Sequence, residues 1–216
     1  MNCKECSGID VTMTKTVFEP AIPSRPVYGV LIPGVGSAHL FVADGEGADA
    51  ICDLFAKAEA QEMKTASRII YVPGANGCDK SVDLQVLGAA QFHRSPSFAS
   101  AQSRLAKVLT DAHMGLQVYA AGTEGLMAQV AALAQAAGLP YEAVQMEHRG
   151  SLARRVQCVH CKGVTENVTL DPFQCSHCGL SLFVRDHFSR RLAAFQGVNI
   201  DAEDPGQVPP AVERFK

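Results

Sequence analysis

Four cysteines near the carboxyl end of the chain are spaced as a metal-binding set. They form two CxxC pairs, Cys158 with Cys161 and Cys175 with Cys178, and thirteen residues separate the pairs. Each pair can fold as a tight knuckle that points two thiolates at one ion, and four thiolates in a tetrahedron select zinc or a single iron. About thirty residues cannot build an adequate core without such a staple, which argues against four free buried thiols. The spacing therefore predicts a four-sulfur metal site.

The identity of the ion decides what such a site does, and the spacing leaves it open. Zinc has no accessible second oxidation state, so it would only hold the fold together. Iron in the same cage would carry one electron, at a potential set by N–H···S bonds and solvent exposure. The short loop between the pairs favours a zinc ribbon. His160 and His177 lie inside the knuckles, but four sulfurs leave no ligand position for them, and we expect both rings to face solvent or a partner.

The remaining cysteines carry less information. Cys3 and Cys6 form a third CxxC on a terminal segment with no second pair nearby, which favours an incidental occurrence or weak metal affinity. Cys52 and Cys78 are lone thiols, and such thiols are more often packing or surface residues than nucleophiles. Because six of the eight cysteines lie in CxxC pairs and the amino terminus lacks an apolar export signal, we expect a cytoplasmic protein rather than a disulfide framework.

An alternation of strand-like and helix-like segments precedes the cysteine pairs. Short buried strands are predicted at 26–32 (PVYGVLI), 39–44 (HLFVAD), 67–74 (SRIIYVPG), 116–122 (LQVYAAG) and 141–147 (YEAVQME). Helical periodicity is present at 47–60, 98–112 and 124–137, where Thr123 can cap the last helix and Gly138 and Pro140 can end it. This order predicts an α/β domain with a parallel sheet flanked by helices on both faces. Residues 74–97 remain unassigned.

Two glycine-containing loops lie where predicted strands end and helices begin. Backbone N–H groups at such places can cradle phosphates, and ligands bind at this edge of open parallel sheets. Around the first loop, however, the carboxylates of Asp44, Glu46 and Asp49 would repel a pyrophosphate. We therefore expect at most a weak or vestigial nucleotide cleft. Its candidate cofactor-binding residues are Gly45, Gly47, Gly122, Thr123 and Glu124.

The segment VRDHFSRRLAAF, residues 184–195, combines basic and aromatic side chains beside the second cysteine pair. Arginine and aromatic residues are enriched at protein–protein contacts, and an arginine could also meet a haem propionate. The alternative is a solvated helix face. Residues 200–216 have little core-forming material, and we expect them to order against a partner. The candidate docking residues are Arg185, His187, Phe188, Arg190 and Arg191.

Charge and hydropathy exclude two kinds of partner. The net charge is −3, and neither residues 1–150 (11 basic, 15 acidic) nor residues 151–216 (8 basic, 7 acidic) carry the excess of a nucleic-acid binder. No apolar run approaches the ~18 residues that a membrane span needs. The 216 residues divide into four predicted parts: 1–25, a flexible segment; 26–150, the α/β domain; 151–196, the metal ribbon with its docking segment; and 197–216, an extended tail.

The strand and helix pattern resembles a known module over residues 27–148. HLFVADGEGADAICDLFAKA and, later, GLQVYAAGTEGLMAQVAALAQAAGLPYEAVQMEHRG are similar to the pyridine-nucleotide domain of ferredoxin-reductase-like flavoproteins. The chain departs from that family at Asp49, Ala121 and Thr123, where the family has proline, cysteine and proline. The preceding flavin barrel of that family is also missing. The resemblance implies the fold, and the departures imply that this chain alone passes no hydride to a flavin.

The combination of a degenerate reductase-like domain, two CxxC pairs and an acidic Pro-containing tail resembles the small subunit family of bacterial dimethylamine monooxygenase. The similarity is sharpest over residues 158–206. It implies that NAD(P)H electrons pass through a reductase subunit with FMN and an iron–sulfur cluster to a haem-binding subunit, which demethylates dimethylamine to methylamine and formaldehyde. In this chain the four cysteines would hold the metal as a rubredoxin-like relay. No catalytic residue is assigned to the chain, and it is not expected to be active alone.

Three other functions compete with that reading. A purely structural zinc-ribbon subunit would share the metal site without a redox role. A nucleic-acid-binding ribbon would need basic patches with interleaved stacking aromatics, which the chain lacks. A self-sufficient dehydrogenase would need an acid or base in the cleft, where the loops supply only crowded carboxylates. Iron, which is coloured and bleaches on reduction, would distinguish a relay from a colourless zinc site.

Overall fold

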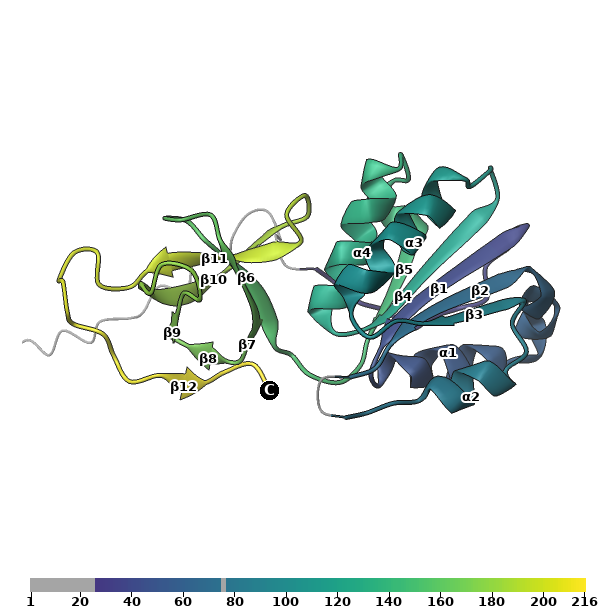
Figure 1. The fold of residues 1–216 in the computed structure, drawn as a ribbon, viewed down its shortest axis with the longest axis horizontal. Coiled ribbons are helices and arrows are strands. Elements are labelled where there is room, and N and C mark those ends of the chain that lie inside the picture. Colours follow the sequence, from purple (N-terminus) through teal and green to yellow (C-terminus); the bar gives the residue numbers. More distant parts are fainter. Residues whose placement is uncertain (1–25, 75–76) are drawn as a thin grey trace, which may run out of the picture.

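A computed structural model describes residues 26–74 and 77–216 of the chain. It contains two lobes, an α/β lobe and a smaller β lobe, which lie side by side along the long axis of the molecule (Figure 1). Within the described ranges, no helix is long and apolar enough to cross a membrane.

The α/β lobe is built on a five-stranded sheet in the order β3-β2-β1-β4-β5, and every pair is parallel. Helices cover both of its faces, as predicted. Along β1, Leu40 and Val42 face α3 and α4, whereas Phe41 and Ala43 face α1 and α2. This alternation is the two-residue period of a strand that is buried on both sides. The strands are β1 (Ala38–Asp44), β2 (Ser67–Val72), β3 (Gln91–Arg94), β4 (Leu116–Gly122) and β5 (Val144–His148). The helices are α1 (Gly47–Phe55), α2 (Ser81–Val86), α3 (Phe98–Thr110) and α4 (Glu124–Ala136), with 3-10 turns η1 (Ala58–Ala66) and η2 (Tyr141–Ala143).

The predicted strand at residues 26–32 is wrong. The segment runs along β5 but makes one backbone hydrogen bond to it, from the N–H of Gly29 to the Met146 carbonyl at 2.9 Å. The N–H of Leu31 donates instead to the Glu147 carboxylate at 2.7 Å, and that of Ile32 to the Gln145 side chain at 3.0 Å. Side chains of β5 therefore take the donors that a strand ladder would have used.

Two further differences concern helices. The helix predicted at 47–60 ends at Phe55, because Lys57 is extended (ψ 141°) and a 3-10 turn follows it. The unassigned residues 74–97 contain α2 and the edge strand β3. The α4 boundaries are as predicted: the Thr123 side chain accepts a hydrogen bond from the N–H of Leu126, and Gly138 has a φ of 94° beyond the helix end.

The β lobe is a second five-stranded sheet, in the order β7-β6-β11-β10-β9. The alternative of a helix at residues 184–195 is wrong, since these residues form the β10–β11 hairpin, in which Phe188 pairs with Phe195. Strand β12 pairs with β8, and Phe215 is only 5% exposed, so the end of the tail orders against its own chain. The strands are β6 (Arg154–Cys158), β7 (Val164–Val168), β8 (Leu170–Asp171), β9 (Phe173–Gln174), β10 (Ser181–Ser189), β11 (Ala194–Asn199) and β12 (Val212–Glu213).

Candidate metal centre

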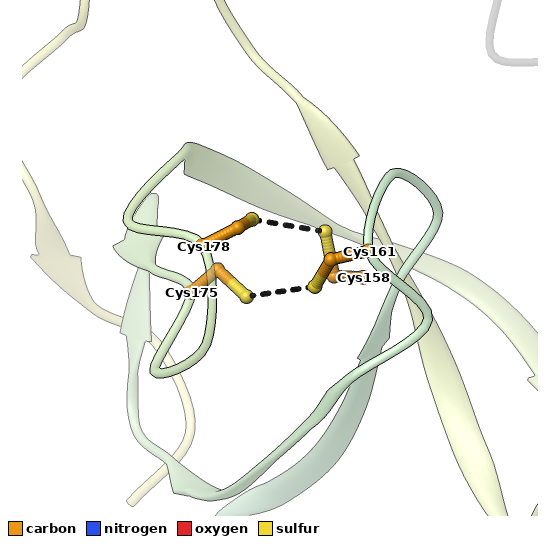
Figure 2. A group of neighbouring side chains, drawn as sticks. All are labelled: Cys158, Cys161, Cys175 and Cys178. Carbon is orange, nitrogen blue, oxygen red and sulfur yellow. Dashed lines mark hydrogen bonds between the residues drawn. The ribbon is translucent and has the colours of Figure 1, made fainter.

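The four predicted ligand sulfurs converge at one end of the β lobe (Figure 2). All four lie within 4.8 Å of one another. The Sγ atoms of Cys158 and Cys178 are 3.8 Å apart, and those of Cys161 and Cys175 are 3.7 Å apart. Four ligands at about 2.3 Å from a central ion, in a tetrahedron, stand about 3.8 Å from each other. A disulfide would require about 2.05 Å. The spacing of the sulfurs therefore fits a tetrahedral metal site.

The two knuckles repeat one backbone pattern. In the first, the N–H of Cys158 donates to the Gly163 carbonyl and the N–H of Lys162 to the Cys158 carbonyl, at 2.9 and 3.0 Å. In the second, Cys175 donates to Leu180 and Gly179 to Cys175, at the same two distances. The residue after the second cysteine has a positive φ in both knuckles, 62° at Lys162 and 74° at Gly179. A glycine suits this backbone conformation at position 179, because it adopts positive φ without steric cost.

The surroundings favour the thiolate, the form that metals bind, at Cys175 but not at Cys178. Burial acts to raise the pKa of Cys175, but N–H groups of Cys178 and His177 donate to its sulfur and lower the pKa to about 6. The N–H of Leu180 lowers the pKa of Cys178, but burial and the neighbouring cysteine sulfurs raise it to about 12. The N–H of Gly163 lies 3.4 Å from the Cys161 sulfur. Cys158 and Cys175 are buried, whereas Cys161 and Cys178 are half-buried. One side of the site therefore approaches the protein surface.

Neither histidine of the knuckles belongs to the sulfur cluster. His160 is exposed. The Nε2 atom of His177 lies 2.9 Å from the Val164 carbonyl, and its ring rests on Gly163, where an added Cβ would come within 2.4 Å. His177 thus ties the second knuckle to β7, the strand that follows the first.

At the predicted nucleotide edge, a carboxylate occupies the N-terminus of α4. Asp44, at the end of β1, accepts hydrogen bonds from the Thr123 N–H at 2.8 Å and from its hydroxyl at 2.6 Å. A Cβ added at Gly122 would lie 1.8 Å from an Asp44 oxygen. Burial raises the pKa of Asp44, against the opposing effect of the Thr123 hydrogen bonds. The N–H of Thr123, one of the backbone donors that a phosphate would use, is therefore already taken.

The two glycines of the first loop are explained by packing. A Cβ at Gly47 would lie 2.1 Å from the Ala121 carbonyl oxygen, so glycine lets α1 approach β4 closely. Gly45 has a φ of 43°, and its N–H donates to the Val72 carbonyl at 3.0 Å. Both requirements hold without a bound phosphate.

Glu124, the last of the predicted cofactor residues, lies at the junction of the two lobes. It is 3% exposed and accepts a hydrogen bond from the Tyr28 hydroxyl at 3.0 Å. Its other carboxylate oxygen lies 3.9 Å from Nε of Arg154 on β6. The Arg154 guanidinium, also 3% exposed, is stacked between the rings of Phe195 and Phe215 at 4.1 and 4.2 Å. Its Nη1 atom is 2.8 Å from an Asp186 oxygen, close enough for an ion pair but not aligned as a hydrogen bond.

Sequence reasoning missed this junction. Arg154 is a charged residue on a strand, and nothing local indicates that two aromatic rings far along the chain enclose it. Of the predicted docking residues, Arg185, His187, Arg190 and Arg191 are exposed. Phe188 is 8% exposed and packs on Phe195, with ring centroids 5.0 Å apart, so its ring belongs to the core of the lobe. The guanidinium of Arg190 lies 4.3 Å from the centre of the Tyr141 ring of the α/β lobe.

One curated relative matches about half of the chain. The chain is 39% identical over 112 residues to the "Heme-dependent oxidative N-demethylase delta subunit" of Ectopseudomonas mendocina (strain ymp), a match that covers 52% of this chain and 64% of that relative. The match therefore covers less than two thirds of the relative's length.

Two solved structures are similar to part of the chain. A flavohemoglobin from Malassezia yamatoensis has 14% identity and a TM-score of 0.40, over 53% of this chain and 32% of that one. Full-length CYP116B46 from Tepidiphilus thermophilus has 22% identity and a TM-score of 0.40, over 61% and 18%.

Family models match both lobes. Residues 20–144 match "Dimethylamine monooxygenase subunit DmmA-like, N-terminal domain", and residues 155–198 match the corresponding C-terminal domain. Because the first match alone spans more than half of the chain, the protein belongs to the DmmA-like family of dimethylamine monooxygenase subunits.

Proposed function

We propose that this chain is a non-haem subunit of a haem-dependent oxidative N-demethylase that converts dimethylamine to methylamine and formaldehyde. The family and the name of the curated relative support this role. Its partners would be a haem-binding monooxygenase subunit and a reductase subunit that carries flavin and an iron–sulfur cluster and accepts electrons from NAD(P)H. In this complex the chain would supply a metal centre and binding surfaces, and the chemistry at the amine would take place on the haem subunit.

The observation that carries the proposal is the sulfur cluster at tetrahedral spacing, half-buried on one side. Cys158, Cys161, Cys175 and Cys178 would hold one ion. If that ion is iron, it supplies one-electron chemistry at this place. The chain's own contribution would then be to hold four thiolates, to direct backbone N–H groups at the sulfurs, and to leave the Cys161 and Cys178 side near solvent. Such an arrangement suits exchange of electrons with a docked partner.

A purely structural zinc site is the second candidate, and the junction between the lobes supports it. Arg154, Phe195 and Phe215 fix the β lobe to the base of α4, where Ala128 packs against the core of the β lobe. A ribbon held rigidly in this way could organise a complex without carrying electrons. In both versions we take the four predicted parts of the chain (1–25, 26–150, 151–196 and 197–216) as its working units, and Arg185, His187, Arg190 and Arg191 as exposed docking residues.

We also propose that the α/β lobe binds no nucleotide. Asp44 already accepts the N–H of Thr123 at the N-terminus of α4, and its charge would repel a phosphate. Titration of NADH against the isolated chain checks this idea, and saturable micromolar binding would contradict it.

The decisive experiment compares wild type with Cys158→Ser and with the control Cys52→Ala, which changes a cysteine outside the cluster. Elemental analysis of the purified chain identifies the ion. For a relay we expect iron, colour that bleaches on reduction, and a Cys158→Ser complex that loses NADH-driven demethylation but recovers it when the haem subunit is reduced chemically. For a structural site we expect colourless zinc and loss of assembly. A metal-free wild-type chain that assembles and supports demethylation would overturn both versions.

A further inference from the structure

A second surface feature lies far from the metal centre, along the edge strand β3. A groove of about 440 Å³ opens there between β3, β2 and helix α3. Its floor comes from the two strands and its wall from Arg104 and Val108 of α3. In Figure 1, β3 lies at the outer edge of the α/β lobe, remote from the β lobe.

The register of the sheet gathers positive charge in this groove. Arg68 of β2 pairs with Gln91 of β3, and Ile70 pairs with His93. Paired residues of neighbouring strands point to the same face of a sheet. Ile70 faces α3 in the core, so Arg68 and His93 face that side as well. Arg104 approaches the same groove from the helix. Three basic side chains from three elements therefore line it, and its lining contains no carboxylate.

These charges are not neutralised within the described part of the chain. In residues 26–74 and 77–216, the side chains of Arg68, His93 and Arg104 make no hydrogen bond or ion pair. Arg94, on the opposite face of the same strand, behaves differently: its guanidinium contacts Asp79 at 2.8 and 3.1 Å. In a chain whose net charge is −3, this groove is a local positive site that complements an acidic ligand.

The backbone of β3 offers a second mode of recognition. Among the described residues, β2 is the one ladder partner of β3. The N–H of Ser95 donates to the Tyr71 carbonyl of β2 at 2.8 Å. Backbone groups alternate in direction along a parallel strand, so those of Phe92 and Arg94 point outward. An extended segment can add to such an edge through main-chain hydrogen bonds, while side-chain contacts give specificity.

We propose that the β3 groove binds an acidic, extended segment of another subunit of the complex, with carboxylates at Arg68 and Arg104 and main-chain hydrogen bonds along β3. The assignment of the acidic segment to a subunit of the demethylase complex rests on the proposed function. A second copy of this chain is disfavoured. Its acidic loop, with Asp201, Glu203 and Asp204, belongs to the β lobe at the other end of the molecule (Figure 1). Such a head-to-tail contact would not form a symmetric dimer, and it would build rings or filaments instead.

The test uses the full chain and a fluorescent, blocked peptide of alternating Glu and Val, with a Lys/Val peptide for comparison. Fluorescence anisotropy should show saturable binding of the acidic peptide, weakened by salt, and no binding of the basic one. The Arg68→Gln/Arg104→Gln double variant should bind at least tenfold more weakly. The control Arg94→Gln/Lys107→Gln removes the same charge from the same strand pair and helix without touching the groove, and it should bind like wild type.

Equal binding by the two double variants would overturn the proposal, as would equal binding of the two peptides. Sedimentation of the free chain is the second measurement. Concentration-dependent rings or filaments that are lost in Arg68→Gln/Arg104→Gln would assign the groove to a second copy instead. With the partner subunits present, the same double variant should also co-purify less of one subunit. Peptide binding needs no demethylase partner. It can therefore fail while the Cys158→Ser experiment supports the proposed function, or succeed while that experiment contradicts it.

Discussion

Replacing Cys158 by Ser removes one thiolate from the metal centre, and the structure indicates how far the damage should spread. The knuckles, residues 158–163 and 175–180, comprise eleven residues of irregular backbone beyond Cys158, which ends β6. Ordering these eleven costs ~1–2 kcal/mol per residue, or ~11–22 kcal/mol in total. The buried cluster around the sulfurs contains one aliphatic side chain, Leu182, whose burial returns ~1.5–3 kcal/mol. Structural zinc in small domains supplies ~10–16 kcal/mol. The knuckles should therefore open without the ion.

The rest of the β lobe should resist this change. Val156, Phe188 and Phe195 form a separate apolar cluster that packs on Ala128 of α4. The α/β lobe has its own cores on both faces of its sheet. Loss of the ion should consequently act locally, and it should leave the main sheet of the molecule folded.

Amide hydrogen exchange followed by mass spectrometry measures this difference. In Cys158→Ser we expect the hydrogen-bonded knuckle amides, those of Lys162, Cys175 and Gly179, to lose at least a hundredfold of their protection, since local opening sets the exchange rate. Peptides from β4 should exchange as in wild type, and Cys52→Ala should leave both regions unchanged. Retained protection of the knuckles in a metal-free variant would refute the reasoning, and so would simultaneous loss of protection in β4.

Two further predictions concern Asp44, at the end of β1, and Phe215, near the end of the chain. Burial raises the pKa of Asp44, so its contribution to stability is present below the ordinary value of 3.8 and is lost as the pH rises through the raised pKa. Asp44→Asn should remove that decline, which urea unfolding at a series of pH values above 4 measures. Phe215→Ala should lower the free energy of unfolding of the β lobe by about 3–5 kcal/mol. The loss cannot exceed the free energy that is needed to detach residues 212–216 from the lobe. Phe215→Leu should lower the free energy of unfolding by less. Equal thermal shifts for the two Phe215 variants would contradict the packing argument.

The parts of the fold that were predictable are those specified by residues near one another in sequence. The apolar run of β1 and the cap at Thr123 have local causes, as do the CxxC spacings. The strand at 26–32 was mispredicted because its donors go to Glu147 and Gln145, more than a hundred residues away. β3 was missed because its sequence, QFHR, is short and polar, as suits an edge strand.

The candidate site divides in the same way. The residue type and spacing of the four cysteines predict a metal site, and the structure brings their sulfurs together. Arg154 gives no such signal, because its aromatic neighbours Phe195 and Phe215 come from β11 and from the chain end. Phe188 was predicted to dock a partner, yet on β10 it falls on the buried face opposite Phe195. The exposed members of a basic and aromatic cluster can therefore be identified only when it is known which face of the strand each residue occupies.

Packing within the chain explains the glycines of the two loops without a bound ligand. Gly122 must lack a side chain because the Asp44 carboxylate lies where its Cβ would be, and Gly47 because the Ala121 carbonyl does. Both constraints arise from the close approach of two helix N-termini to the ends of β1 and β4. A lobe that bound NAD(P)H would need those helix ends open to a phosphate, whereas here Asp44 caps α4 from within the chain. We infer that the α/β lobe serves as a base, on which Glu124 and Arg154 position the β lobe with its four cysteines and from which the β3 edge would face a partner.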